Sequence, residues 1–255
     1  MSVAGQLTVR SIRKAFGGVK AVDDVSFFVH PGEMVAIIGP NGAGKSTCFN
    51  MLGGQIMPDA GEIRFDGHLI NGLGPSKIWR LGIGRTFQVT ATFPSMSVRE
   101  NLQMVLLSHR KKLNNWWRPA PSYFLDQADR LLDLTSLRVQ ASRPCGVLSY
   151  GDLKRLDLAM ALGSSPRLLL MDEPTAGMAP TERIAMMKLV RNLMESEGVS
   201  ILFTEHDMDV VFGHADRVIV LNRGQVIASG GPAAIREEKH VQEVYLGGGT
   251  MYGAA

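Results

Sequence analysis

The chain has 255 residues, of which 45% are hydrophobic and 20% charged, and this composition fits one globular α/β unit. Its 27 basic and 24 acidic residues nearly balance, which argues against nucleic acid as a partner. No apolar run approaches the roughly 18 residues of a membrane span and the N-terminus lacks a signal-peptide core, so we expect a soluble chain that reaches a membrane only through partners. Cys48 and Cys145 lie in no metal-ligand spacing and fit idle thiols in a reducing cytosol.

Short runs of β-type residues alternate with helical patterns along the chain. Two runs, at 6–16 and 61–67, alternate in polarity and predict a smaller antiparallel sheet. Five other short runs are also of β type, and several of these are continuously apolar, as strands buried on both faces of a parallel sheet are. This second group lies at 25–29, 34–39, 167–172, 200–205 and 217–222. The pattern therefore predicts an α/β core.

A glycine-rich loop follows the run at 34–39 and opens a helix with Lys-Ser-Thr. The spacing G-x-x-x-x-G-K-[ST] after a strand is typical of a loop whose backbone N–H groups cradle phosphate. We expect Lys45 to contact the β- and γ-phosphates and the Ser46 hydroxyl to bind Mg²⁺. The alternative is a glycine-rich turn with a chance lysine. The predicted nucleotide-binding residues are Gly39, Pro40, Asn41, Gly42, Ala43, Gly44, Lys45, Ser46 and Thr47.

The middle of the chain predicts a helical subdomain, at about 89–163, inserted between strands of the core. Ser97, with Glu100 three residues later, has the form of a capping box. The stretch 108–122 mixes basic residues, tryptophans and prolines, which breaks the helical period and indicates a loop or hinge. A nucleic-acid patch is the alternative, but a solvated or partner-contacting loop fits the small net charge better.

Two adjacent carboxylates end the apolar strand at 168–174. Neighbouring positions on a strand point to opposite sides, so the two side chains are expected to have different roles. Asp172 is the natural ligand for the Mg²⁺ water shell, and Glu173 would face the γ-phosphate and orient or deprotonate a water. In the alternative, both acids merely cap the next helix. A water-activating carboxylate favours a hydrolase over a phosphotransferase, which must exclude water.

Two further polar residues follow predicted strands at the edge where such folds bind ligands. His206 comes after the strand at 200–205 and could contact the γ-phosphate or hold the attacking water. Gln88 ends the short stretch RTFQ and could touch both Mg²⁺ and water. As isolated residues both would be weak signals. The phosphate loop and the carboxylates strengthen the case for His206.

The stretch LSYGD at 148–152 starts a predicted helix and is, by itself, either an ordinary helix start or half of a shared site. Taken in order, GPNGAGKST, RTFQ, LSYGD, LLLMDEP and the Glu-His pair at 205–206 resemble the full motif set of ATP-binding cassette ATPases, over about residues 7–247. The resemblance implies a P-loop NTPase core with a mostly parallel sheet, an N-terminal antiparallel β subdomain and an inserted helical subdomain. It implies one domain at 1–247; the tail at 248–255 is expected to be mobile.

The resemblance also implies roles for individual residues, with ATP and Mg²⁺ as cofactors. Ser149 and Gly151 would contact the γ-phosphate of ATP held by another subunit, which decides the question of LSYGD in favour of the shared site. Gln88 would be the Q-loop residue. Glu173 would be the catalytic carboxylate and His206 the switch histidine. Phe16 would fall where the family stacks an aromatic ring on adenine, although a Phe that ends a strand is as often a core residue.

Finer features narrow the resemblance to one group of importers. FGGVKAV at 16–22, EHDMDVV at 205–211 and VYLG at 244–247 look like the ATPase subunits of branched-chain amino acid importers, in particular the subunit with the longer helical insertion. That group implies a heterodimer with a second ATPase subunit, two permease subunits and an extracytoplasmic solute-binding protein. It places the chain on the cytoplasmic face of the membrane, docked through about 88–106.

One departure concerns the end of the LSYGD stretch, where the family commonly has Gln and this chain has Asp152. A negative charge near an anionic nucleotide is unfavourable, but an acid at a helix N-terminus is stabilised, so Asp152 could cap the helix and turn away from the phosphates. The alternative is a weakened signature. At the level of function, the alternatives are a soluble ATP-driven clamp without transport and a phosphotransferase, the latter disfavoured by Glu173 and LSYGD.

Overall fold

A computed structural model describes residues 7–86, 92–109 and 124–246 of the chain. Its centre is a six-stranded sheet in the order β10-β9-β3-β8-β7-β6. The strands are β3 (Met34–Ile38), β6 (Ile83–Arg85), β7 (Leu168–Asp172), β8 (Ser200–Thr204), β9 (Arg217–Asn222) and β10 (Gln225–Gly230). All neighbouring pairs are parallel except β9 and β10. Every residue of β3 and β8 is buried, which confirms the parallel core predicted from the apolar runs.

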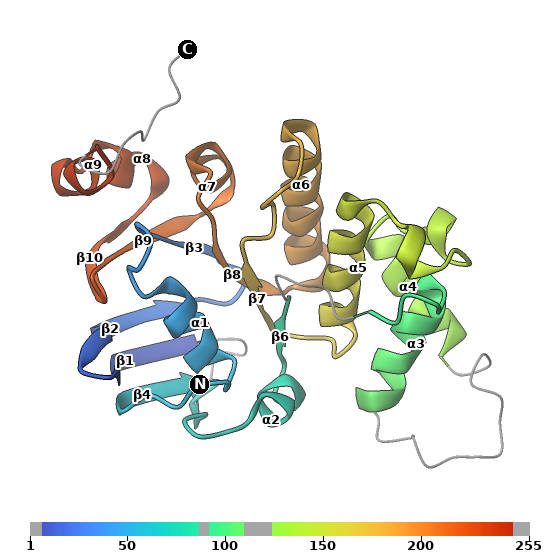
Figure 1. Ribbon diagram of the computed structural model, residues 1–255, viewed down its shortest axis with the longest axis horizontal. Coiled ribbons are helices and arrows are strands. Elements are labelled where there is room, and N and C mark those ends of the chain that lie inside the picture. The colour runs from blue at the N-terminus through green and yellow to red at the C-terminus, as the bar shows by residue number, and fades with distance from the viewer. Residues whose placement is uncertain (1–6, 87–91, 110–123, 247–255) are drawn as a thin grey trace.

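A second sheet of four antiparallel strands, in the order β2-β1-β4-β5, lies against the first (Figure 1). Its strands are β1 (Leu7–Phe16), β2 (Val19–Val29), β4 (Ala60–Phe65) and β5 (His68–Leu69). The prediction for 6–16 and 61–67 is confirmed. Grouping 25–29 with the core strands was wrong, because this run belongs to β2 and its residues alternate between buried and exposed. The exposed Phe28 ring lies under the Arg217 guanidinium at 4.4 Å, which lets an apolar ring occupy a solvent-facing position.

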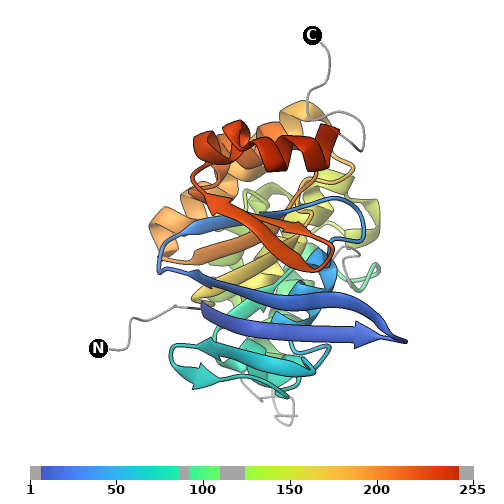
Figure 2. The ribbon, with the colours of Figure 1, turned by 90° about the vertical axis from the view of Figure 1, so that its left-hand side faces the viewer.

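The two faces of the six-stranded sheet build separate cores. Because neighbouring strand residues point to opposite faces, Val35 and Ile37 pack with the antiparallel sheet and α1, whereas Ala36 and Ile38 pack with the larger helical layer. The first face carries α1 (Lys45–Leu52) and α2 (Pro75–Arg80). The second carries α3 (Val98–His109), α4 (Leu125–Leu134), α5 (Tyr150–Leu162), α6 (Pro180–Glu197), α7 (Met208–His214), α8 (Pro232–Glu237) and α9 (Lys239–Leu246). Figures 1 and 2 show the sheet between these layers.

The segment expected to form a helical subdomain contains α3, α4 and α5, with the 3₁₀ turns η2 (Arg138–Gln140) and η3 (Cys145–Val147) between α4 and α5. The capping box before α3 is confirmed: Ser97 N donates to Glu100 Oε2 at 2.8 Å, and Glu100 N donates to Ser97 Oγ at 3.2 Å. Part of 108–122 and the tail at 248–255 lie outside the described residues. Within the described ranges, the helices are all too short or too polar to cross a membrane.

Candidate active site

The phosphate loop connects the end of β3 to the start of α1, and its backbone requires glycine at two positions. A Cβ at Gly39 would lie 2.1 Å from the carbonyl oxygen of Leu221. Gly44 has φ of +101° and a Cβ there would lie 2.4 Å from the carbonyl oxygen of Ala21. The loop therefore packs directly against neighbouring backbone. The first turn of α1 follows at once, with its free N–H groups and the exposed Ser46 at the loop.

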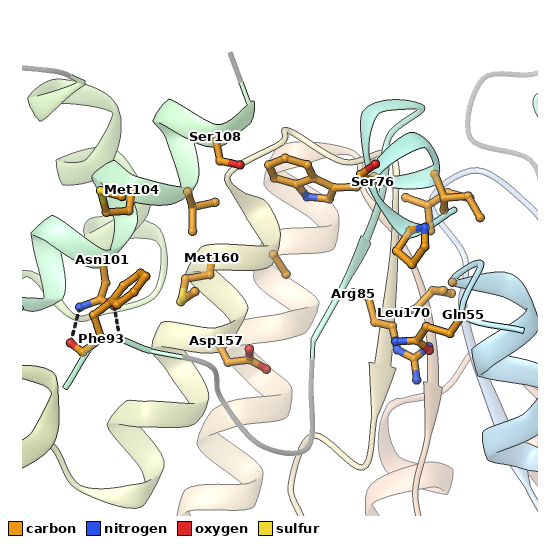
Figure 3. A pocket seen from close by; sticks show the side chains of 17 residues that line it. Gln55, Ser76, Arg85, Phe93, Asn101, Met104, Ser108, Asp157, Met160 and Leu170 are labelled. Carbon is orange, nitrogen blue, oxygen red and sulfur yellow. Dashed lines mark hydrogen bonds between the residues drawn. The ribbon is translucent and has the colours of Figure 1, made fainter. Parts of the chain in front are cut away.

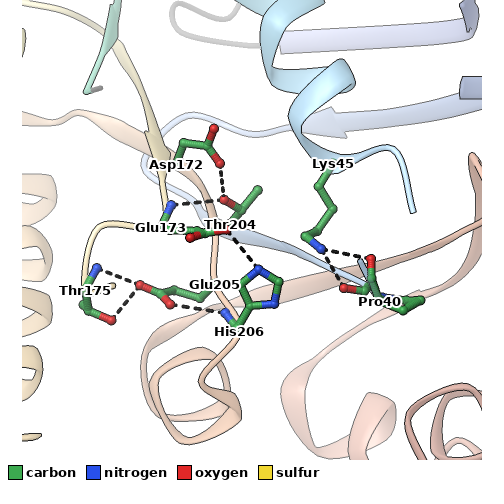
Figure 4. A network of polar contacts seen from close by, with 9 residues as sticks. Pro40, Lys45, Asp172, Glu173, Thr175, Thr204, Glu205 and His206 are labelled. Carbon is green, nitrogen blue, oxygen red and sulfur yellow. Dashed lines mark hydrogen bonds and ion pairs between the residues drawn. The ribbon is translucent and has the colours of Figure 1, made fainter. Parts of the chain in front are cut away.

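Lys45 lies across the phosphate loop and is almost completely buried, with 7% of its surface exposed. Its Nζ donates to the carbonyl oxygens of Gly39 at 2.6 Å and Pro40 at 3.2 Å (Figure 4). Burial lowers the pKa of Lys45, while the nearby negative charges of Glu173 and Asp172 raise it. The ammonium group is thus already at the loop and faces the carboxylate end of β7.

Asp172 ends β7, and both of its carboxylate oxygens have partners. Thr204 Oγ1 donates to Oδ1 at 2.6 Å, and Arg85 Nη2 lies 3.7 Å from Oδ2. The Asp172 and Arg85 side chains are 11% and 13% exposed. Burial lowers the pKa of Arg85, and the charge of Asp172 opposes that shift. This carboxylate is therefore held in one orientation at the edge of the sheet.

Glu173 follows the strand rather than continuing it. Its φ is +50°, in the left-handed region, and its N–H donates to the Thr204 carbonyl and hydroxyl oxygens, both at 3.1 Å. Strand alternation was the reason given for different roles of Asp172 and Glu173. That reason was wrong, because the chain turns at Glu173. The turn brings Glu173 Oε1 to 2.9 Å from His206 Nε2 (Figure 4). The structure thus joins two residues that the sequence singled out separately.

A buried network that the sequence did not reveal holds the two arms of this site together. Glu205 is 3% exposed and accepts from Thr175 N at 2.8 Å, from Thr175 Oγ1 at 2.6 Å and from His206 N at 3.2 Å. Nearby, Arg183 donates to the Met178 carbonyl at 2.9 Å and pairs with Asp207 at 2.5 Å. The segment after Glu173 and the segment around His206 are therefore linked. An acid directly before His206 was the available signal.

The LSYGD stretch begins α5 on the other face of the sheet from α1. Ser149 is the N-cap, its Oγ accepting from Asp152 N at 3.1 Å, so the expectation that Asp152 itself caps the helix is wrong. Asp152 lies in the first turn, where the helix dipole favours its charge. Ser149 is exposed and Gly151 is buried, and Tyr150 Oη donates to the Ala176 carbonyl at 3.1 Å. The structure does not bring this stretch to the chain's own phosphate loop.

Of two other predicted site residues, Phe16 and Gln88, the structure describes the first. Phe16, at the end of β1, is 48% exposed, and Lys14 Nζ lies 5.6 Å from its ring centre. An exposed ring of this kind is available for stacking. Gln88 lies outside the described residues.

The donor chemistry of the site fits a nucleotide and Mg²⁺. Among the described residues no three His, Cys, Asp or Glu side chains gather into a metal cluster. Mg²⁺ in nucleotide sites is typically held by one or two carboxylates, water and substrate phosphates. The Ser46 hydroxyl and the oriented Asp172 carboxylate are ligands of this kind. The N–H groups of the loop and Lys45 supply the donors for an anion.

A groove of about 560 Å³ lies between α2 and β6 on one side and α3 and α5 on the other. Apolar side chains such as Trp79, Met104 and Met160 line it, together with Phe93, which is 53% exposed. Figure 3 shows Arg85 and Gln55 at one end of the groove, near Leu170 of β7. The groove therefore reaches Arg85, whose guanidinium lies 3.7 Å from Asp172.

Comparison with known proteins agrees with this geometry. The ABC transporter family model matches residues 22–176, and a model described as branched-chain amino acid ATP-binding cassette transporter matches residues 225–250. The chain is 38% identical over 251 residues to the high-affinity branched-chain amino acid transport ATP-binding protein LivG of Escherichia coli (strain K12), covering 94% of this chain and 97% of that protein. It is 37% identical, with the same coverage, to the correspondingly described BraF of Pseudomonas aeruginosa.

Solved structures are similar over nearly the whole chain. An ATP-binding cassette of an ABC transporter in its ADP conformation matches with a TM-score of 0.84 and 31% identity, covering 94% of this chain and 98% of that one. A dimeric ATP-binding cassette in a post-hydrolysis state, bound to ADP and Pi, matches with a TM-score of 0.75 and 26% identity, covering 89% and 98%. The predicted fold class is confirmed by these neighbours.

Proposed function

This chain belongs to the ABC transporter family, as an ATP-hydrolysing subunit, and we propose that it powers the import of branched-chain or related amino acids. The observation that carries hydrolysis is the contact of 2.9 Å between Glu173 Oε1 and His206 Nε2 at the end of the sheet that bears the phosphate loop. The amino acid class rests on the relatives named for branched-chain amino acid transport and on the matching C-terminal segment.

We assign the roles within one site as follows. The glycine loop and Lys45 bind the phosphates, and the ammonium exchanges the carbonyls of Gly39 and Pro40 for phosphate oxygens. Ser46, Asp172 and Gln88 would hold Mg²⁺, which would supply positive charge beside the phosphates.

The reaction itself uses Glu173 and His206. The Glu173 carboxylate orients the attacking water and accepts its proton, and His206 fixes that carboxylate through the contact between Nε2 and Oε1. Bond cleavage at the γ-phosphorus releases ADP and phosphate. Phe16 provides the exposed ring against which adenine stacks.

The site is completed by a second subunit. The phosphate loop and the LSYGD stretch lie on opposite faces of the sheet, so one chain does not supply both to the same nucleotide. Ser149 and Gly151, at the N-terminus of α5, contact the γ-phosphate of ATP held by the partner. Asp152 follows Gly151 directly, so its negative charge affects the strength of this contact. We propose a heterodimer with a second ATPase subunit.

The permease contacts the groove lined by Trp79, Phe93 and Met160, which continues to Arg85. An apolar surface with an exposed phenylalanine suits an amphipathic helix of a partner. We propose that the chain lies on the cytoplasmic face of the membrane and that a solute-binding protein on the other side delivers the amino acid to the permease.

The test compares Glu173→Gln with Lys45→Ala and the unmodified chain. We expect Glu173→Gln to bind ATP and lose most phosphate release, because the amide accepts no proton, and Lys45→Ala to lose both. Hydrolysis by Glu173→Gln at the unmodified rate would contradict the assignment. Light scattering of Glu173→Gln with Mg-ATP, alone and with the second ATPase subunit, tests the shared site, and a mixture that stays monomeric with ATP bound would overturn it.

A further inference from the structure

Arg85, the last residue of β6, joins three elements at the inner end of the groove. Its Nη1 donates to the carbonyl oxygen of Phe49, in the last turn of α1, at 3.1 Å and to the Gln55 side chain. Its Nη2 donates to Asn50 Oδ1 at 2.9 Å and lies 3.7 Å from Asp172 Oδ2. One guanidinium therefore spans the helix that starts at the phosphate loop and the strand that ends in the metal carboxylate.

The structure makes room for this side chain at Gly53. A Cβ at that position would lie 2.8 Å from Arg85 Nη1 and 3.4 Å from Cδ. The backbone at Gly53, with φ of −81°, is in the ordinary right-handed region, so a side chain there would strain no backbone and would displace the end of Arg85. The planar fork of Arg85 thus fits a pocket that a single methyl group would close.

The contact with Asp172 differs from a direct hydrogen bond. At 3.7 Å, Arg85 Nη2 does not take up a lone pair of Oδ2, whereas Thr204 Oγ1 donates to Oδ1 at 2.6 Å. Both side chains are nearly buried, so the opposite charges attract with little screening by water. Arg85 therefore orients the carboxylate while its second oxygen stays available to a cation.

We propose that Arg85 is a positioning residue whose fork holds Asp172 in register with the phosphate loop, so that the carboxylate meets Mg²⁺ brought by the nucleotide. This inference rests on the proposed function. A lysine cannot replace the fork, because a single ammonium does not reach the Phe49 carbonyl, Asn50 and Asp172 in one plane.

The experiment measures how much Mg²⁺ tightens nucleotide binding, in the Glu173→Gln background so that no hydrolysis occurs. The Kd of a fluorescent ATP analogue is determined with EDTA and with excess Mg²⁺. The readout is the Kd in EDTA divided by the Kd in Mg²⁺. Arg85→Met and Arg85→Lys are expected to lower this ratio about tenfold, the usual effect of losing a group that orients a metal ligand. Both should leave the Kd in EDTA nearly unchanged.

Gly53→Ala keeps the charge of Arg85 and displaces the fork, and it is expected to lower the same ratio. It also guards against misfolding of the arginine variants. Arg217→Met is the matched control. Arg217, at the start of β9, is paired with Glu33, and the two side chains are 17% and 13% exposed, much like Arg85 and Asp172. This control should lose stability and keep the Mg²⁺ ratio.

Two results would overturn the inference and leave the proposed metal site standing. A ratio that stays at the parental value, or rises, in Arg85→Met and Gly53→Ala would show that Arg85 does not position Asp172. Full rescue by Arg85→Lys would show that charge suffices without the fork. A parental protein with no Mg²⁺ effect at all would instead remove the proposed metal site, and the inference with it.

Discussion

We expect the hydroxyl group of Thr204, although small, to have a large effect on both stability and ATP turnover. It donates to Asp172 Oδ1 at 2.6 Å and accepts from Glu173 N at 3.1 Å, so one buried oxygen orients both acids. Thr204→Val removes this oxygen and keeps the shape of the side chain. The backbone carbonyl of Thr204 still accepts from Glu173 N at 3.1 Å, so the substitution mainly removes the hydrogen bond to the Asp172 carboxylate.

The magnitude follows from the charge of that acceptor. A hydrogen bond to a charged group contributes about 1.5–3 kcal/mol, and Thr204 is 1% exposed, so water cannot replace the lost donor. We expect Thr204→Val to lower the free energy of unfolding by that amount. Because the hydroxyl also orients the carboxylate that we propose to hold Mg²⁺, ATP turnover should fall about 10- to 100-fold.

The assay is urea unfolding of the nucleotide-free protein, so that ligand binding does not add to the stability, together with phosphate release. Thr204→Ser is the matched control, since it keeps the hydroxyl and loses only a methyl group. The reasoning fails if Thr204→Val has the urea midpoint and turnover of the unmodified chain, or if Thr204→Ser is damaged as much as Thr204→Val.

Two further predictions concern stability and thiol reactivity. Ala179, the N-cap of α6, has the extended backbone of a cap and donates to Glu182 Oε2 at 3.1 Å but offers no side-chain acceptor. Ala179→Ser should complete the capping box and raise the free energy of unfolding by about 1 kcal/mol in urea, whereas Ala179→Val should give no gain. Burial raises the pKa of Cys48 to about 12 and of Cys145 to about 11, so a thiol reagent should label neither until the chain is unfolded. Unfolded thiols lose their protons from about pH 8.5, whereas the folded thiols keep theirs. The free energy of unfolding should therefore fall as the pH rises from about 8.5 toward 11, and replacing both cysteines by alanine should reduce that decline.

The parts of the fold that the sequence predicts are those with local or strictly periodic signals. Strands β3 and β8 are buried on both faces; β3 is entirely apolar, and β8 has an apolar centre between Ser200 and Thr204. The phosphate loop has a fixed spacing set by backbone geometry. The prediction for β2 was wrong because the adjacent Phe27 and Phe28 hide its alternation of polarity. The exposed position of Phe28 is explained only by the Arg217 guanidinium over its ring, a contact that the sequence does not reveal.

The contacts that orient the site were out of reach for a different reason. Thr204 and Asp172 are separated by 32 residues, and Arg85 and Asn50 by 35. No spacing rule relates such pairs, since sheet order places β8 beside β7 and β6 at the edge. The same holds for Glu205, whose partner Thr175 lies 30 residues earlier.

The left-handed backbone at Glu173 sets stability against turnover at one position. A non-glycine residue with φ near +50° carries a strain of about 1–3 kcal/mol, which glycine avoids. Selection for heat resistance alone would thus favour losing the carboxylate. Glu173→Gly would therefore exchange turnover for stability, and its pair with a hydrolysing subunit would keep one hydrolysing site and one site that only binds.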